Sequence, residues 1–220
     1  DLGATLVSAR YGRGFVDLNR DARELDPDMF SDGLPRTAGL PGTRVKAGLG
    51  CLPKIASTGD VFYASKLTRE EGEARLFHIH DVYHAGLKQE LGRFSEEWPE
   101  HILIDCHSMP SRQPGRPKLP DIVLGDRFGS SCSAKLTSLV ERHFRKAGFS
   151  VARNAPYAGG YITRAYGRPK RGCHVLQIEL NRSLYMEEQS VEKSRGFEPT
   201  KDVITQLIAD LMRFARKFCS

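Results

Sequence analysis

The sequence predicts an α/β protein with three α/β/α layers, in which helices cover both faces of a central mixed sheet. Short apolar segments of strand length alternate along the chain with segments of roughly 15–25 residues that have helical periodicity. The chain has 220 residues, 40% of them hydrophobic, so it can bury a core without help from disulfides. No internal repeat or low-complexity linker divides it. One domain over residues 1–220 is therefore expected.

The first third of the chain has few regular signals. Residues 4–9 and 15–18 are expected to be short strands around a glycine-containing turn. Residues 20–67 have poor periodicity and many turn-forming residues. A long irregular stretch in a compact domain is more often a functional loop than a simple connection.

Three segments have the apolar periodicity of amphipathic helices. The first begins at Thr68, which forms a T-x-x-E capping box with Glu71, and is expected to end near residue 94. The second is expected over residues 131–147, with Ser131 or Ser133 as its N-cap and Gly148 beyond its end. The third is expected over residues 200–218.

Four apolar segments lie between or beside these helices and are expected to be strands. They are residues 101–105, 121–124, 149–152 and 173–181. The segment 154–167, rich in Gly, Pro and Tyr, is expected to be a loop.

Composition excludes several classes of protein. No apolar run approaches the ~18 residues that a membrane-spanning helix needs, so a membrane protein is not expected. The net charge of +6 could help to bind a small acidic substrate, or it could reflect a mildly basic surface without a binding function. The main basic cluster, residues 112–118, is interrupted by Pro and Gly and contains no aromatic residue, which argues against nucleic-acid binding. Five widely spaced cysteines without a CxxC motif predict a reduced, cytoplasmic protein.

The first candidate functional residues lie at the end of the strand predicted at 101–105, where Asp105, Cys106 and His107 are adjacent. Sites in α/β proteins gather at the carboxyl ends of strands, so His107 could be a metal ligand or an acid–base group, with Asp105 orienting it. A strand-end histidine bonded to backbone is the plain alternative. Cys106 and His107 would point to opposite faces of a strand and could not form a nucleophile dyad. No G-x-S-x-G motif is present either.

The strand predicted at 173–181 carries polar residues on one face, among them Gln177, Glu179 and Asn181. In a sheet covered on both sides this row would be costly unless it lined a cavity, which makes Glu179 a candidate general base. An exposed edge strand would explain the same pattern without any function.

Other candidates depend on short motifs. Asn19 and Arg20 could bind a carboxylate, because a guanidinium binds carboxylates in a bidentate way, although Arg20 could equally pair with Asp17. The loop that contains Gly159, Gly160 and Arg164 is either a substrate loop or a tight connection. His80 and His84 lie on the packed side of their helix and are more easily explained as core histidines, with His84 the better functional candidate.

Six motifs in order resemble the N-formylglutamate amidohydrolase family: VDLNR, VYHAGL, IDCHSMPS, PDIVLGDRFGSSC, NAPYAGGYITRAYGRP and HVLQIELNRSLYMEE. The resemblance extends from about residue 4 to 217. It implies a zinc-exopeptidase-like (phosphorylase/hydrolase-like) fold, similar to the zinc carboxypeptidases and aspartoacylase. It also implies a bacterial, cytoplasmic amidohydrolase that cleaves N-formyl-L-glutamate into formate and glutamate during histidine degradation.

The resemblance also implies roles for individual residues. His107 matches the second of two histidines that, with one acidic residue, hold zinc, and Glu179 matches the general base. Asn19 and Arg20 match an element that grips a substrate carboxylate. Arg164, Arg182 and His84 are further substrate-binding candidates, and a substrate with two carboxylates would need a second anchor. The first histidine and the acidic ligand belong to an N-terminal Pro-His-Ser-Gly-type segment that this sequence does not contain, so these ligands are expected upstream of Asp1.

Two rival hypotheses remain open at this point. One is another aspartoacylase- or carboxypeptidase-like amidohydrolase on the same scaffold, because a fold does not set the substrate. The other is a non-catalytic homologue that keeps the pocket without a metal.

Overall fold

The computed structural model describes residues 2–56, 59–112 and 118–216. The chain forms two compact units. We call Leu6–Arg93 the N-terminal unit, and Asp1–Thr5 with Phe94–Ser220 the sheet unit. Each is described by itself, and the expectation of a single domain stays a prediction. No helix in the described part of the chain has the length and apolar character needed to cross a membrane.

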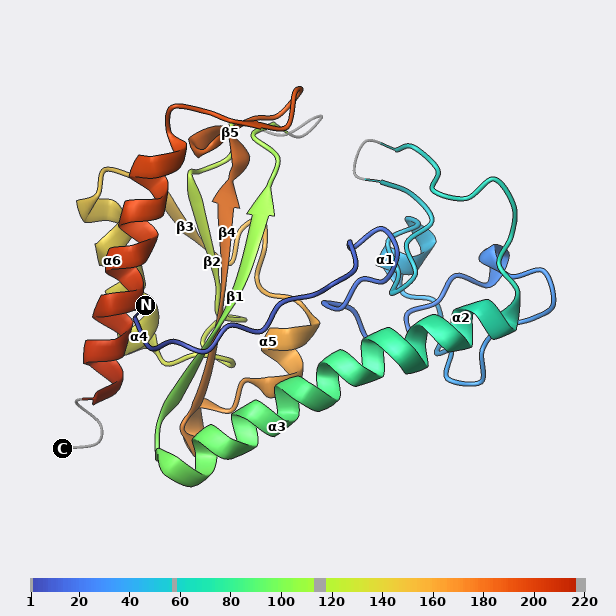
Figure 1. Ribbon diagram of the computed structural model, residues 1–220, viewed down its shortest axis with the longest axis horizontal. Helices are drawn as coiled ribbons and strands as arrows, with labels where there is room; N and C mark the ends of the chain where they lie inside the picture. The colour runs from blue at the N-terminus through green and yellow to red at the C-terminus, as the bar shows by residue number, and fades with distance from the viewer. Residues whose placement is uncertain (1, 57–58, 113–117, 217–220) are drawn as a thin grey trace. The chain divides into compact units, whose positions relative to one another are not determined.

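A four-stranded mixed sheet organises the sheet unit (Figure 1). β1 (His101–Met109) runs parallel to β4 (Cys173–Asn181), and β4 is antiparallel to β2 (Ile122–Gly125). β2 in turn runs parallel to β3 (Val151–Arg153). The α/β class with a mixed central sheet is therefore confirmed.

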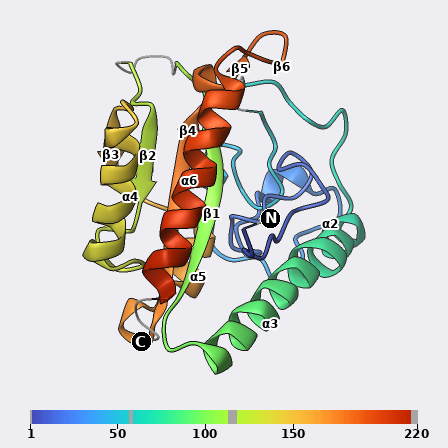
Figure 2. The same cartoon turned by 60° about the vertical axis from the view of Figure 1, so that its left-hand side comes forward.

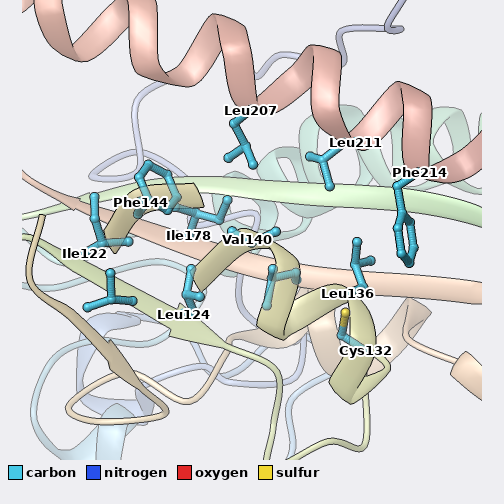
Figure 3. Packing of buried hydrophobic residues seen from close by; sticks show 12 residues of the cluster. Ile122, Leu124, Cys132, Leu136, Val140, Phe144, Ile178, Leu207, Leu211 and Phe214 are labelled. Atoms are coloured by element: carbon cyan, nitrogen blue, oxygen red, sulfur yellow. The ribbon is translucent and has the colours of Figure 1, made fainter. Parts of the chain in front are cut away.

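Two helices, α4 (Ala134–Lys146) and α6 (Phe197–Arg216), cover one face of this sheet (Figure 2). Ser133 is the N-cap of α4 and accepts a hydrogen bond from the N–H of Leu136. Apolar side chains from the helices and from alternate strand positions form the core between them, which Figure 3 shows. Its buried members are Ile122, Leu124, Cys132, Leu136, Val140, Phe144, Val151, Leu176, Ile178, Leu207, Leu211 and Phe214.

The opposite face of the sheet carries the polar side chains of β1 and β4 and the short helix α5 (Tyr161–Tyr166). This helix lies within residues 154–167, which the sequence predicts to be a loop, and it begins where Gly160 serves as its N-cap. The smaller elements of the unit are η3 (Pro169–Arg171), η4 (Arg182–Leu184), and a hairpin of β5 (Met186–Glu187) and β6 (Glu192–Lys193).

A long helical segment forms most of the regular structure of the N-terminal unit (Figure 1). α2 (Arg69–Arg75) begins at the predicted capping box and is followed by the π-helical segment η2 (Leu76–Asp81). α3 (Val82–Glu97) continues it beyond the predicted end at residue 94. The remaining elements are η1 (Pro27–Met29) and α1 (Thr43–Lys46). Its core contains Val16, Leu18, Leu25, Met29, Phe30, Cys51, Leu52, Leu67 and Leu76.

Some predicted elements differ from the structure. Residues 4–9 and 15–18 are not strands, because the N–H groups of the second segment bond within turns and to Cys51 rather than to a sheet. The strand predicted from residue 149 begins at Val151, since the N–H of Phe149 still closes the end of α4. The predicted helix end at residue 218, Cys219 and most of the basic cluster 112–118 lie outside the described residues.

Candidate active site

The pairing of β1 with β4 brings polar side chains together on the face opposite α4 and α6. In this parallel register His107 lies beside Glu179, and Asp105 lies beside Gln177. Since residues in register share a face, all four side chains project to the same side of the sheet. The pairs lie near the carboxyl ends of both strands, where ligand sites in α/β proteins are found. We call these four residues the strand-end cluster.

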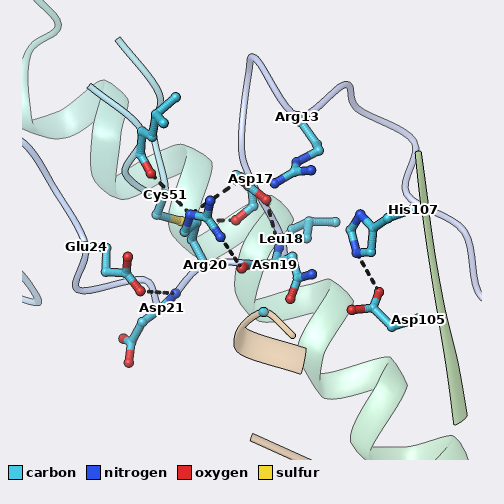
Figure 4. A network of polar contacts seen from close by, with 12 residues as sticks. Arg13, Asp17, Leu18, Asn19, Arg20, Asp21, Glu24, Cys51, Asp105 and His107 are labelled. Atoms are coloured by element: carbon cyan, nitrogen blue, oxygen red, sulfur yellow. Dashed lines mark hydrogen bonds and ion pairs between the residues drawn. The ribbon is translucent and has the colours of Figure 1, made fainter. Parts of the chain in front are cut away.

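The first half of the strand-end cluster is an aspartate–histidine pair. Nε2 of His107 is 2.8 Å from Oδ1 of Asp105, and both side chains are largely buried (Figure 4). A carboxylate accepts hydrogen bonds, so the proton of a neutral His107 ring is held on Nε2 and the lone pair lies on Nδ1. Metal-ligating histidines commonly donate their second nitrogen to a carboxylate in this way. The sequence-based expectation that Asp105 orients a neighbouring group agrees with this contact.

The second half is a chain of hydrogen bonds through Gln177. Its Nε2 donates to Oε1 of Glu179 over 2.8 Å, and its Oε1 accepts from the N–H of Gly160 over 2.8 Å. Gln177 and Glu179 are 4% and 7% exposed, so the contacts are shielded from water. Sequence reasoning placed Gln177 on the polar face but gave it no role. Its position two residues before Glu179 on one strand face was the signal.

The glycine-containing loop rests directly on β2. A Cβ on Gly125 would lie 2.7 Å from the backbone nitrogen of Gly159, which is closer than real side chains allow. Gly159 itself has a φ of +118°, a conformation that L side chains rarely adopt. Gly125 therefore permits the close approach of the loop to β2, and the loop places the N–H of Gly160 against Gln177.

The two further arginine candidates of the sheet unit occupy different positions. Arg182 directly follows β4, and its Nε donates to Oγ of Ser108, the residue after His107. It therefore lies next to the strand-end cluster. Arg164 is an exposed residue of α5, and its guanidinium carbon lies 5.4 Å from the centre of the Tyr161 ring.

Asn19 and Arg20 belong to a tightly held turn of the N-terminal unit (Figure 4). We call Asp17, Leu18, Asn19 and Arg20 the DLNR turn. The Asn19 N–H donates to Oδ1 of Asp17, and Arg20 donates from Nε to the Leu49 carbonyl and from Nη1 to the Asn19 carbonyl. Nε of Arg20 also lies 3.7 Å from Asp17, the pairing that the sequence left open. Burial lowers the pKa of Arg20 below its ordinary value.

His80 and His84, two of the histidines of the long helix, are buried against this turn. Nε2 of His84 is 2.9 Å from the Leu18 carbonyl, and Nε2 of His80 is 3.0 Å from the Arg20 carbonyl. The expectation that they lie on the packed face of the helix is confirmed. Burial, and to a lesser extent the charge of a neighbouring His80, lowers the pKa of His84 to about 4, so its imidazole is neutral at pH 7.

Within the described ranges, no group of three His, Cys, Asp or Glu side chains is arranged to hold a metal ion. His107 with Asp105 has the chemistry of one zinc ligand and its supporting carboxylate. A protein zinc site needs at least three ligands, so the described residues alone do not fit a zinc ion.

The chain is similar to proteins of one family. Residues 1–186 match the model of the N-formylglutamate amidohydrolase family. The chain is 36% identical to the N-formylglutamate deformylase of Pseudomonas putida, over 96% of this chain and 76% of that protein. It is 32% identical to the N-formylglutamate deformylase of Pseudomonas aeruginosa, over 99% of this chain and 78% of that protein.

Two solved structures are similar to it. The crystal structure of N-formylglutamate amidohydrolase from Ralstonia eutropha JMP134 superposes with a TM-score of 0.85 at 33% identity, covering 93% of this chain and 75% of that one. A protein from Agrobacterium tumefaciens shares the fold, with a TM-score of 0.62 at 14% identity over 90% of this chain and 66% of that one. The family match and the two deformylases together establish that the chain belongs to the N-formylglutamate amidohydrolase family.

Proposed function

We propose that this protein hydrolyses the formyl amide of N-formyl-L-glutamate to formate and glutamate, with Glu179 as the general base. The observation that carries this assignment is the contact of Gln177 with Glu179, which holds a buried carboxylate in one orientation beside His107. Orientation of this kind is what a catalytic base requires. The names of two deformylases and one amidohydrolase among the relatives support the substrate.

The reaction adds one water molecule across the amide bond. Glu179 accepts a proton from water, and the oxygen of that water attacks the formyl carbon to form a tetrahedral intermediate. The C–N bond then breaks, and the nitrogen receives the proton that Glu179 had taken. Glu179 is then ionised again, the formic acid passes its remaining proton to the amino group, and formate and the free amino acid leave.

Charge recognition is assigned to arginines. N-formyl-L-glutamate has two carboxylates. We propose that Asn19 and Arg20 bind one of them, and that Arg182, with Arg164 as a further candidate, binds the other. The contact of Arg182 with Ser108, beside His107, supports the choice of Arg182. Arginine suits this task because its planar guanidinium binds a carboxylate through two parallel hydrogen bonds.

Zinc dependence is part of the same proposal and is supported by resemblance and by the pairing of His107 with Asp105. When bound, zinc would polarise the formyl oxygen and make water more acidic. Because the described residues supply too few ligands, this part of the proposal requires ligands from outside them. Cytoplasmic location and a place in bacterial histidine degradation are proposed on the resemblance alone.

The decisive experiment measures formate release from N-formyl-L-glutamate by the wild-type protein, with and without a chelator, together with the bound zinc. Chelator-sensitive release supports both the reaction and the metal. N-acetyl amino acids and peptides are tested in parallel, and release from these alone would replace the proposed substrate. No turnover of any of them, without zinc, would overturn the assignment in favour of a non-catalytic homologue.

A further inference from the structure

The helix that packs on the DLNR turn changes its winding at the first of the two histidines that contact the turn. η2 (Leu76–Asp81) is π-helical, whereas α2 before it and α3 after it are ordinary α-helices. A π-helical turn contains an extra residue, so it rotates the side chains on either side of it relative to each other. Such segments are rare and are frequent at functional sites.

The two buried histidines, His80 and His84, emerge at the end of this segment and one turn beyond it. Their ring centres are 4.4 Å apart, and the residues are 3% and 5% exposed. Nε2 of His84 contacts the Leu18 carbonyl, and Nε2 of His80 contacts the Arg20 carbonyl. Leu18 and Arg20 are the residues before and after Asn19, so the two imidazoles bind the backbone on both sides of Asn19.

The chemistry of the contacts determines the direction of each hydrogen bond. A backbone carbonyl only accepts, so each imidazole must donate from Nε2, and that nitrogen carries a proton in both rings. Further bonds of the turn come from its own residues and from Arg13, Leu49 and Cys51. Among the residues described here, the helix contributes these two donors to the backbone of the turn.

We infer that His80 and His84 are positioning residues for substrate binding, which fix the backbone on both sides of Asn19 so that Asn19 and Arg20 meet a substrate carboxylate. This inference rests on the proposed function, because it gives the DLNR turn its task there. A buried carbonyl without a hydrogen-bond donor costs free energy. If either imidazole is removed, we therefore expect the turn to shift so that its carbonyl finds another partner. A displaced turn should weaken substrate binding without changing the chemical step at the formyl group.

Substitutions of His84 test this inference. The amide nitrogen of glutamine reaches about as far as Nε2 of histidine, so His84→Gln can still donate to the Leu18 carbonyl, whereas His84→Leu cannot. We expect His84→Leu to raise KM for N-formyl-L-glutamate about tenfold with kcat within about threefold, and His84→Gln to restore KM. His78→Leu, on an exposed histidine of the same helix, is the matched control and should leave both constants unchanged. A folded His84→Leu protein with wild-type KM would overturn the inference.

Two further variants cover the remaining outcomes. If His84→Leu does not fold, His84→Asn takes its place, since asparagine is too short to reach the carbonyl, and equal KM in the Asn and Gln variants would contradict a positioning role. In an Arg20→Ala background, His84→Leu should raise KM less than twofold further, because both changes then act through one turn. Full additivity would show that His84 acts by another route.

A readout without turnover separates this inference from the proposed function. The NMR resonance of the Arg20 Nε–H group should move in His84→Leu but stay in place in His84→Gln and His78→Leu. If wild-type protein releases no formate, the proposed function fails, and this resonance still tests the positioning of the turn. An unchanged resonance in folded His84→Leu would refute it.

Discussion

Gln177 and Glu179 lie two residues apart on one face of β4, and the carboxamide of the first donates a hydrogen bond of 2.8 Å to the carboxylate of the second. The same carboxamide accepts from the backbone of Gly160. One side chain therefore connects the candidate base to the loop that rests on β2. This relationship makes the geometry of Glu179 dependent on a residue that performs no chemistry itself.

Replacement of Glu179 by glutamine should abolish most of the activity, because an amide cannot accept the proton of the attacking water. We expect kcat for formate release to fall by about 10²–10⁴, with the fold retained. Glu198→Gln is the matched control: Glu198 lies in the same unit, is exposed and pairs only with Lys201 among the contacts described. Near-wild-type kcat in folded Glu179→Gln would exclude Glu179 as the base.

Replacement of Gln177 by leucine removes its hydrogen bonds with Glu179 and Gly160 at similar side-chain size. A bond to a charged group contributes about 1.5–3 kcal/mol, so we expect kcat to fall roughly ten- to a hundredfold. Gln177→Glu keeps the acceptor for Gly160 but loses the donor to Glu179, so it should not recover the rate. Steady-state kinetics on both variants test this, and full activity of Gln177→Glu would show that only the loop contact matters.

Replacement of Asp105 by asparagine should weaken the support of His107. The amide can present its NH₂ group instead of an acceptor, which disfavours the Nε2–H form of the ring. We expect a loss of about 10–100-fold in activity or in zinc affinity. Zinc content and formate release, measured on the same preparation, report this. If both stay at the wild-type level, Asp105 has no role in orienting the imidazole.

Stability should depend on pH through His84. Its pKa is about 4 in the folded protein and 6.5 without burial, so the unfolded state binds more protons between these values. The free energy of unfolding should therefore be fully retained above about pH 6.5 and fall as the pH drops toward 4. Allowing for solvent screening, the loss is on the order of 2 kcal/mol. Urea unfolding at pH 4.5 and 7 should show a smaller difference in His84→Gln than in the wild type, whereas equal differences would count against a neutral buried His84.

Replacement of Gly125 by alanine should displace the glycine loop. The new Cβ would meet the backbone nitrogen of Gly159 at 2.7 Å and the carbonyl carbon of Ala158 at 2.9 Å, and backbone cannot yield as a side chain does. We expect a loss of about 1–3 kcal/mol in unfolding free energy together with lower activity. Gly86→Ala is the contrasting case: outside the backbone of its own helix, no atom lies within 4 Å of the Cβ that would be added, and the helix should gain roughly 0.5–1 kcal/mol. Denaturant titrations of both proteins test the pair, and an undisturbed Gly125→Ala protein would refute the close approach.

Local signals in the sequence predicted those elements whose cause is local. The capping box of Thr68 and Glu71 and the Ser133 cap both begin helices at the expected positions. The apolar segments predicted at residues 101–105 and 173–181 are both strands, because alternating or continuous apolar residues suit a half-buried or buried sheet, and β1 extends beyond the prediction to Met109. His107 and Glu179 were candidates for the same reason, since strand ends and polar faces can be identified from spacing alone.

Tertiary structure decided what depends on partners that are distant in the sequence. Residues 4–9 and 15–18 have strand-like composition but no strand pairing, so they are irregular, and only the register of β1 with β4 brings Asp105 and His107 alongside Gln177 and Glu179. The sequence by itself determined the family, the mixed α/β class and the candidate base. The bond from Gly160 that holds Gln177, and the imidazoles that hold the DLNR turn, arise from packing between segments 17 to 66 residues apart, which no local pattern encodes.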